Sequence, residues 1–203
     1  MDIYKQTKIL YDKIAEGWKN IRTKPFDFVK EFAKEIKNKK ILDVGCGTGT
    51  QILAFDKSNV FFCLDFSKNM IKIAKEKLKD YNAYFIIADA RNLPFKNFSF
   101  DYVISIACLH HLKKEDFLNA INEIKRVCKG KILVSVWKRN IKHFFALLLG
   151  FLKFKKFGYA LVSWKHKGKK YYRIYYLYTK KELKNLLPDA KIIEFKDNLL
   201  IYI

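Results

Sequence analysis

The chain has 203 residues, of which 50% are hydrophobic and 16% aromatic. This composition excludes a disordered protein and supplies enough apolar residues for one large domain. Lysine and arginine total 41 against 20 acidic residues, a net charge of +21. That excess favours a polyanionic partner, nucleic acid first, although a lysine-rich proteome would give the same balance.

The four cysteines, Cys46, Cys63, Cys108 and Cys128, include no CxxC pair. They indicate neither a zinc site nor a disulfide framework, so no metal is predicted and a reduced cytoplasm is the expected location. The N-terminal stretch carries polar residues every few positions, unlike a signal peptide. The long apolar run at 144–152 is too short for a transmembrane segment, which needs about 20 residues, but could lie on a membrane surface or a partner.

Two helices are predicted first along the chain. An apolar stripe at helical spacing runs from Ile3 to Trp18 and includes Tyr11, and Pro25 opens a second helix with an apolar face of its own. Residues 1–38 are therefore expected to form a helical cap.

Residues 39–137 are predicted to be the cofactor-binding core. Apolar runs of strand length alternate there with amphipathic segments of helix length, as in a parallel sheet covered by helices. The strands are KILDVG, NVFFCLD, AYFIIADA, FDYVISIA and KILVSVW. Gly130 is interpreted as the end of the helix that precedes the last of these strands. These features predict an α/β protein with a doubly wound, mostly parallel sheet.

The last third of the chain differs in composition. Residues 138–178 are basic and aromatic and are interpreted as an insertion on the substrate side. Residues 179–203 are predicted to form a short helix beginning at Thr179 and two strands around a turn near Asp197. With these two strands the sheet has seven, in a single domain spanning 1–203.

Three glycines at alternate positions follow the first strand, in ILDVGCGTG. Ligands of open parallel sheets bind beyond the carboxyl ends of the strands, so this loop is the expected cofactor site. Gly45 and Gly47 remove side chains where a ligand must lie against the backbone. The spacing is not the GxGxxG of dinucleotide-binding proteins, but Asp65, twenty residues after Gly45, suits the two hydroxyls of a ribose.

Four motifs in this order, LDVGCGTG, LDFS, ADARNLPF and SFDYVISI, resemble the motif set of the class I S-adenosylmethionine-dependent methyltransferases. The resemblance implies S-adenosylmethionine as the cofactor. Gly45 and Gly47 would lie against its methionine part, Asp43 would steady the loop and Asp65 would hold the ribose.

The same resemblance assigns the adenine pocket. Phe66 would pack on the adenine, Asp89 and Ala90 would meet its amino edge, and Ile106 would close the other face. Tyr11 is expected either to pack over the cofactor or to belong to the core of its helix.

Three further stretches, 11–28, 103–112 and 162–183, resemble the tRNA wobble-uridine methyltransferase family that esterifies 5-carboxymethyluridine. The resemblance implies that a carboxylate oxygen attacks the methyl group, a reaction that needs positioning more than a general base. Arg22 is the candidate to hold the carboxylate of substrate or cofactor, and its alternative is a solvated surface residue. His110 is the candidate to contact the base or orient the carboxylate, although a packed histidine is an equal alternative.

The basic and aromatic segment suits RNA. Lysines neutralise phosphates and flat rings stack on unpaired bases, so it is expected to bind the tRNA anticodon loop. A strand with its tyrosines in the core and its lysines in water is the alternative. The candidate RNA-binding residues are Lys165, Lys167, Lys169, Lys170, Tyr171, Tyr172 and Arg173.

A protein partner is also implied. In the sheet order of the family, the third strand is an edge, and here residues 83–90 carry no lysine to guard it. Enzymes of this family often bind a small zinc-ribbon activator, so such a protein is expected to pair with this edge.

Two other functions stay open. One is a class I methyltransferase that acts on a small apolar molecule such as a quinone precursor, which the apolar run at 144–152 would suit. The other is a non-catalytic RNA-binding or scaffold protein that keeps the cofactor fold.

Overall fold

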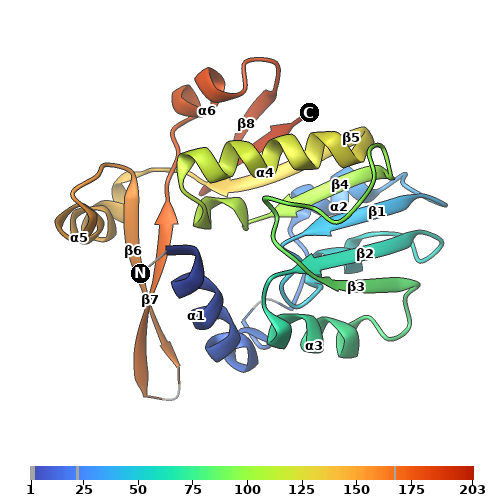
Figure 1. Cartoon of the computed structure of the whole chain (residues 1–203), viewed down its shortest axis with the longest axis horizontal. Helices are drawn as coiled ribbons and strands as arrows, with labels where there is room; N and C mark the ends of the chain where they lie inside the picture. The colour runs from blue at the N-terminus through green and yellow to red at the C-terminus, as the bar shows by residue number, and fades with distance from the viewer. Residues whose placement is uncertain (1–2, 22, 167) are drawn as a thin grey trace.

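The computed structural model describes residues 3–21, 23–166 and 168–203. Two of the predicted site residues, Arg22 and Lys167, lie outside these ranges. Within them, the chain forms one sheet of seven strands and a separate two-stranded sheet, with helices packed around both (Figure 1).

The large sheet has the strand order β3-β2-β1-β4-β5-β9-β8. Neighbouring strands are parallel except around β9, which runs antiparallel between β5 and β8. The order confirms the predicted doubly wound α/β sheet and leaves β3 at an edge. The strands are β1 Lys40–Val44, β2 Val60–Asp65, β3 Ala83–Ile87, β4 Phe100–Ile106, β5 Cys128–Trp137, β8 Lys191–Phe195 and β9 Asn198–Tyr202.

Helices cover both faces of this sheet, because alternate side chains of each buried strand point to opposite sides. Leu42 of β1 packs in the cluster that holds α4 (Lys114–Val127) and α6 (Lys180–Leu186). Its neighbour Ile41 packs in the opposite cluster, with α2 (Asp27–Ala33) and α3 (Lys68–Lys77). The second of the two expected N-terminal helices therefore packs on the sheet itself.

The first N-terminal helix, α1 (Ile3–Trp18), is fastened to α3. Asp12 accepts a hydrogen bond from Ser67 Oγ at 2.6 Å, and its backbone carbonyl accepts one from Asn69 Nδ2 at 2.9 Å. Ser67 is also the N-cap of α3, where its side chain accepts from the amide of Met70. These bonds hold α1 over the carboxyl ends of the strands.

The segment between β5 and α6 forms an arm beside α1 (Figure 1). It contains η3 (Ile141–His143), α5 (Phe144–Phe154) and the antiparallel hairpin of β6 (Tyr159–His166) and β7 (Lys169–Tyr176). Strand β7 of the hairpin lies next to α1. The predicted basic and aromatic insertion is thus a helix and a hairpin with their own small sheet.

Candidate functional site

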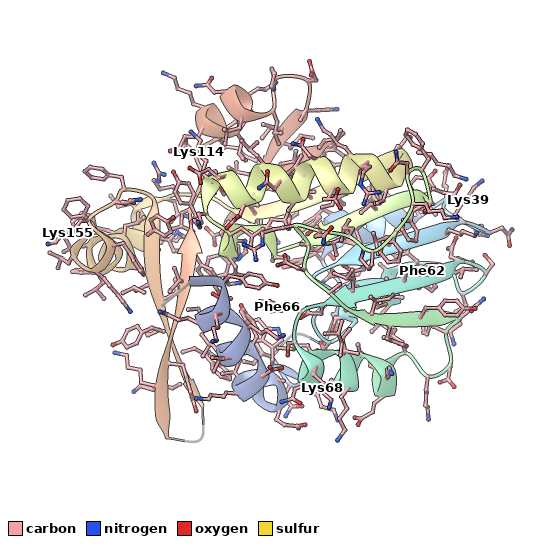
Figure 2. All side chains as sticks on the ribbon, in the orientation of Figure 1. Lys39, Phe62, Phe66, Lys68, Lys114 and Lys155 are labelled. Carbon is pink, nitrogen blue, oxygen red and sulfur yellow. The ribbon has the colours of Figure 1, made fainter. Side chains whose placement is uncertain are left out.

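A cavity lies beneath α1 at the carboxyl ends of β1, β2 and β4. Side chains of α1, the loops after β1 to β4, the end of β5 and strand β7 line it. β1 and β4 are neighbours in the sheet but not in the chain, so the cavity lies at the point where the strand order reverses. Figure 2 shows Phe66 there, between α1 and the large sheet.

The glycine loop after β1 has three left-handed residues, with φ of 75° at Gly45, 53° at Gly47 and 73° at Gly49. A Cβ on Gly45 would collide with the side chain of Cys108 in the loop after β4. At Gly47, a Cβ would meet no described atom within 4 Å. Because Gly47 lines the cavity, its bare backbone leaves room for a ligand.

Gly49 lies where the loop packs against α3. The segment after it is the short 3-10 helix η1 (Thr50–Ala54). A Cβ on Gly49 would meet Leu78 Cδ1 at 2.7 Å and Ala74 Cβ at 3.4 Å, so the glycine lets the loop pack against α3.

Asp65 ends β2 with both carboxylate oxygens in the loop region. Oδ2 accepts a hydrogen bond from the amide of Gly47 at 2.9 Å, and Oδ1 accepts one from the amide of Ser67 at 2.9 Å. Burial raises the pKa of Asp65 to about 6, against the lowering effect of these amides. The group is therefore ionised at neutral pH, and each oxygen keeps a lone pair for a hydroxyl donor.

Asp43, two residues before the loop, is buried in β1. Burial, with the nearby charge of Asp65, raises the pKa of Asp43 to about 8. Its Oδ2 has no hydrogen-bond partner in the described part of the chain. The loop is fastened by backbone bonds, since the amides of Gly45 and Cys46 both donate to the carbonyl of Leu64, so the steadying role of Asp43 stays a prediction.

The residues predicted for the adenine come together at the cavity. Phe66, Asp89, Ala90 and Ile106 all line it, as does Tyr11. They come from three different strand ends and from α1, so their meeting here follows from the sheet order. Their contacts with a cofactor stay predictions.

Sequence reasoning missed two partners of Asp89. Arg91 donates from Nη2 to Asp89 Oδ2 at 2.7 Å, and its guanidinium lies 4.0 Å from the ring centroid of Tyr4. Burial would raise the pKa of Asp89, but the hydrogen bonds from Arg91 and Tyr4 outweigh it and lower that pKa. Tyr4 stands seven residues before Tyr11, on the same helix face, and this spacing could have indicated it.

His111 joins three elements. Its Nδ1 lies 3.0 Å from the carbonyl oxygen of Ile174 in β7, and its Nε2 lies 2.7 Å from the hydroxyl of Tyr11 in α1. A carbonyl only accepts, so Nδ1 carries the proton and Tyr11 donates to Nε2. Burial lowers the pKa of His111 to about 3, which keeps the ring neutral.

His110, the histidine that sequence reasoning preferred, is also buried and lines the cavity. Its ring centroid lies 4.7 Å from that of Tyr175 and 5.7 Å from that of Trp137. The structure thus places both histidines of η2 (Leu109–His111) at the cavity wall. The predicted contact of His110 with a substrate base stays a prediction.

Arg173, expected to face RNA from the hairpin, lies inside instead. It is 8% exposed, lines the cavity, and has its guanidinium 5.1 Å from the ring centroid of Trp18 and 5.3 Å from that of Tyr175. Its Nε has no hydrogen-bond partner among the described residues. Of the described side chains that line the cavity, Arg173 is the one cation, so it can bind an anion there.

The other RNA candidates lie on the hairpin. Lys165 and Lys170 are exposed, and the ammonium of Lys170 lies 5.1 Å from the ring centroid of Tyr172, which is 45% exposed. Tyr171 is half-buried against Trp164, with ring centroids 6.2 Å apart. Lys169 begins β7, and Lys167 lies outside the described residues.

Residues 41–131 match the family described as methyltransferase domain. A tRNA (carboxymethyluridine(34)-5-O)-methyltransferase of Arabidopsis thaliana is 37% identical over 132 residues, which are 63% of this chain and 31% of that protein. The chain thus spans about a third of the length of this curated relative.

Two solved structures show the same fold. A SAM-dependent methyltransferase of Methanosarcina mazei has a TM-score of 0.72 and 21% identity, over 88% of this chain and 97% of that one. A chain of the complex between the Haloferax volcanii Trm112 methyltransferase activator and a methyltransferase has a TM-score of 0.68 and 15% identity, over 95% and 96%.

The sheet order is that of the class I methyltransferase fold, and residues 41–131 match the methyltransferase domain family, so the cofactor is S-adenosylmethionine. Within that class it is similar to the tRNA carboxymethyluridine methyltransferases. The cavity fits the cofactor, because Gly47 leaves its backbone bare, Asp65 is ionised beside it, and Asp89 presents a carboxylate at the far wall.

Proposed function

We propose that the chain is an active methyltransferase that esterifies the carboxylate of 5-carboxymethyluridine at the wobble position of tRNA. The observation that carries the proposal is Arg173, the one cation among the described lining residues, set beside the rings of Trp18 and Tyr175. A carboxylate that enters the cavity meets a guanidinium, and a flat base meets aromatic rings.

Methyl transfer to a carboxylate requires little proton transfer by the protein. When bound, S-adenosylmethionine supplies a methyl group on a sulfonium; the carboxylate oxygen forms the new bond as the bond to sulfur breaks. A carboxymethyl group is already ionised near neutral pH, so a general base is not needed. The neutral ring of His111 agrees with such a site. The chain contributes orientation and the exclusion of water.

Two arginines are candidates to bind the carboxylate of the substrate or of the cofactor. Sequence reasoning gave the role to Arg22, which lies outside the described residues. We assign Arg173 to the substrate carboxylate because it comes from β7 and contacts the ring that packs against His110. Arg22 then remains a candidate for either carboxylate, and His110 for the uridine base.

The hairpin is proposed to hold the anticodon loop. The sequence contains no acidic residue between Glu123 and Glu182, and Lys165, Lys170 and Tyr172 are exposed on β6 and β7. Lysines and an exposed ring suit phosphates and unpaired bases. Part of the segment also belongs to the core, as the alternative interpretation expected, because Tyr175 and Tyr178 are buried there. A cytoplasmic location, where tRNA is found, is proposed with this function.

An activator of the Trm112 kind is proposed to pair with β3. Among the described strands, β3 pairs with β2 alone, and Tyr84 and Ile87 on it are 54% and 52% exposed. Unguarded apolar edges invite strand pairing. The fold shared with a chain of the Haloferax volcanii complex supports the same partner.

The test uses radiolabelled-methyl S-adenosylmethionine and tRNA that bears 5-carboxymethyluridine, with and without the zinc-ribbon protein. We expect label in an alkali-labile methyl ester after digestion to nucleosides. Arg173→Gln is expected to lower methyl transfer about ten- to a hundredfold, the worth of a charged hydrogen bond, while calorimetry shows nearly normal cofactor binding.

Three results would change the proposal. If Arg173→Gln loses the cofactor instead, Arg173 binds the cofactor's own carboxylate, and Arg22→Gln should then lose transfer alone. If wild-type protein binds the cofactor but never labels this RNA, the tRNA function is wrong and a small apolar acceptor becomes the better candidate. If the cofactor does not bind, a non-catalytic scaffold is favoured.

A further inference from the structure

The helix α5 presents its apolar side chains to solvent. The residues of this outer stripe are Ile141 of the adjoining η3 and, on α5, Phe144, Phe145, Leu148, Leu149 and Leu152, and their exposed fractions run from 43% for Leu148 to 88% for Ile141. Their spacing of three and four residues puts them on one side. A surface helix of a globular protein usually buries that side, so the outer stripe requires an explanation.

The inner side of α5 is already occupied, so the helix cannot turn the stripe inward. Gly150 is buried, and a Cβ on it would collide with the backbone carbonyl of Tyr159 in β6. Ala146 and Leu147 pack against the buried cluster of Ala160, Tyr175 and Leu177. The orientation of the stripe is therefore fixed by packing.

Positive charge surrounds the outer stripe. Lys142 lies next to its first residue and Lys153, Lys155 and Lys156 follow it, in a stretch with no acidic residue between Glu123 and Glu182. Lys142 has a partner elsewhere in Asp197, at 3.4 Å on an exposed surface. This charge favours an anionic occupant and opposes a second copy of the chain, which would bring the same lysines.

Two features favour a lipid surface over RNA. Bases stack on flat rings, but Leu148, Leu149 and Leu152 offer branched aliphatic groups. The helix also lies at the outer end of the arm, so a flat surface can reach it without touching the large sheet (Figure 1). Figure 2 places Lys155 at this end of the molecule.

We propose that α5 docks on an anionic membrane surface. Phenylalanine and leucine of the outer stripe enter the boundary of head groups and acyl chains, and the lysines bind anionic head groups. The helix lies in the plane of the surface, since no helix in the described ranges is long and apolar enough to cross a bilayer. The inference does not depend on the proposed methyl transfer.

Flotation of the full chain with vesicles tests the inference. We expect the protein to float with phosphatidylcholine vesicles that contain phosphatidylglycerol, and much less with phosphatidylcholine alone. Phe145→Ser combined with Leu149→Ser is expected to lower the partition coefficient at least tenfold. Phe98→Ser combined with Ile193→Ser is the matched control, because it removes an exposed phenylalanine and an exposed aliphatic residue far from α5.

A second pair of variants tests the charge. Lys153→Gln with Lys156→Gln is expected to lower binding to the anionic vesicles several-fold, whereas Lys68→Gln with Lys72→Gln on α3 leaves it unchanged. Thermal unfolding and methyl transfer to tRNA should be the same in all four double variants.

Several outcomes would overturn the inference. Wild-type protein that stays at the bottom with anionic vesicles rejects a membrane and leaves an acidic protein as the occupant. Flotation that survives the Phe145 and Leu149 change shows binding by charge alone. Sedimentation velocity that shows a dimer, lost in the same double variant, assigns the outer stripe to a second copy.

Discussion

Gly45 and Gly47 share a left-handed backbone but have different neighbours, and this difference predicts different effects of alanine. Either alanine adds about 1 kcal/mol of backbone strain. Gly45→Ala also collides with Cys108, so we expect a larger loss of unfolding free energy. Gly47→Ala should fold and instead lose about tenfold or more in cofactor affinity. Denaturant unfolding and calorimetric titration measure both; equal cofactor affinities of Gly47→Ala and wild type would contradict the assignment of the loop.

Asp43 makes the stability of the free protein depend on pH. Its pKa is 3.8 as an ordinary side chain and about 8 in the folded protein. Between these values the folded chain holds a proton that the unfolded chain has released, so stability falls as pH rises, by up to about 1.4 kcal/mol per pH unit. Asp43→Asn removes this contribution.

We therefore expect the unfolding free energy of Asp43→Asn to fall less than that of wild type between pH 5 and pH 8. Asp189→Asn, at an exposed site, serves as the control. Part of the decline in unfolding free energy up to about pH 6 should persist in wild type and in Asp43→Asn, because burial also raises the pKa of Asp65. If the unfolding free energies of wild type and Asp43→Asn change in parallel with pH, Asp43 ionises normally in the fold.

Asp12 holds helix α1 in place over the cavity. Its side chain and backbone bind Ser67 and Asn69 at the start of α3. Asp12→Ala removes the side-chain bonds to Ser67 Oγ and to the amide of Asn69, together worth roughly 1 to 2 kcal/mol. We expect faster hydrogen exchange in α1 and faster cofactor dissociation in stopped-flow measurements, whereas Asp80→Ala in the exposed turn after α3 changes neither. Unchanged dissociation would mean that α1 is not the cover.

The elements that sequence predicted well have strong periodicity. The five core strands, the helix after Ser67 and the C-terminal hairpin all occur, because each is a buried apolar run or a capped amphipathic segment. The prediction that Gly130 ends a helix was wrong, because α4 ends at Val127 and Gly130 lies in β5. A Cβ on Gly130 would collide with the backbone carbonyl of Asp101. That glycine serves a strand contact that local sequence does not reveal.

Some residues of the candidate site could likewise be predicted from the sequence and others could not. Asp65, Phe66 and Asp89 were predictable, since each ends or follows a strand whose carboxyl end must face the cavity. The burial of Arg173 and the bond from Tyr11 to His111 were not, because the first depends on where the arm folds back and the second on how α1 packs against η2. Contacts between residues a hundred positions apart leave no local pattern.

The net charge of +21 predicts salt-dependent tRNA binding. The affinity should fall steeply with salt, whereas cofactor affinity changes little. Lys165→Gln with Lys170→Gln should reduce the slope of the logarithm of the tRNA binding constant against the logarithm of salt concentration by about 1.4. This is the loss expected for two single-strand phosphate contacts. Lys68→Gln with Lys72→Gln is the control pair. An unchanged slope in the hairpin variant would place the RNA elsewhere.

The position of β9 in the large sheet has a consequence for biosynthesis. β9 supplies Leu199, Leu200 and Ile201 to the core and lies between β5 and β8, yet residues 138–197 are made before it. Until β9 leaves the ribosome, β5 is an open apolar edge and both layers of the core are incomplete. The growing chain therefore completes its sheet late, and nascent chains that stall in the arm should depend on chaperones.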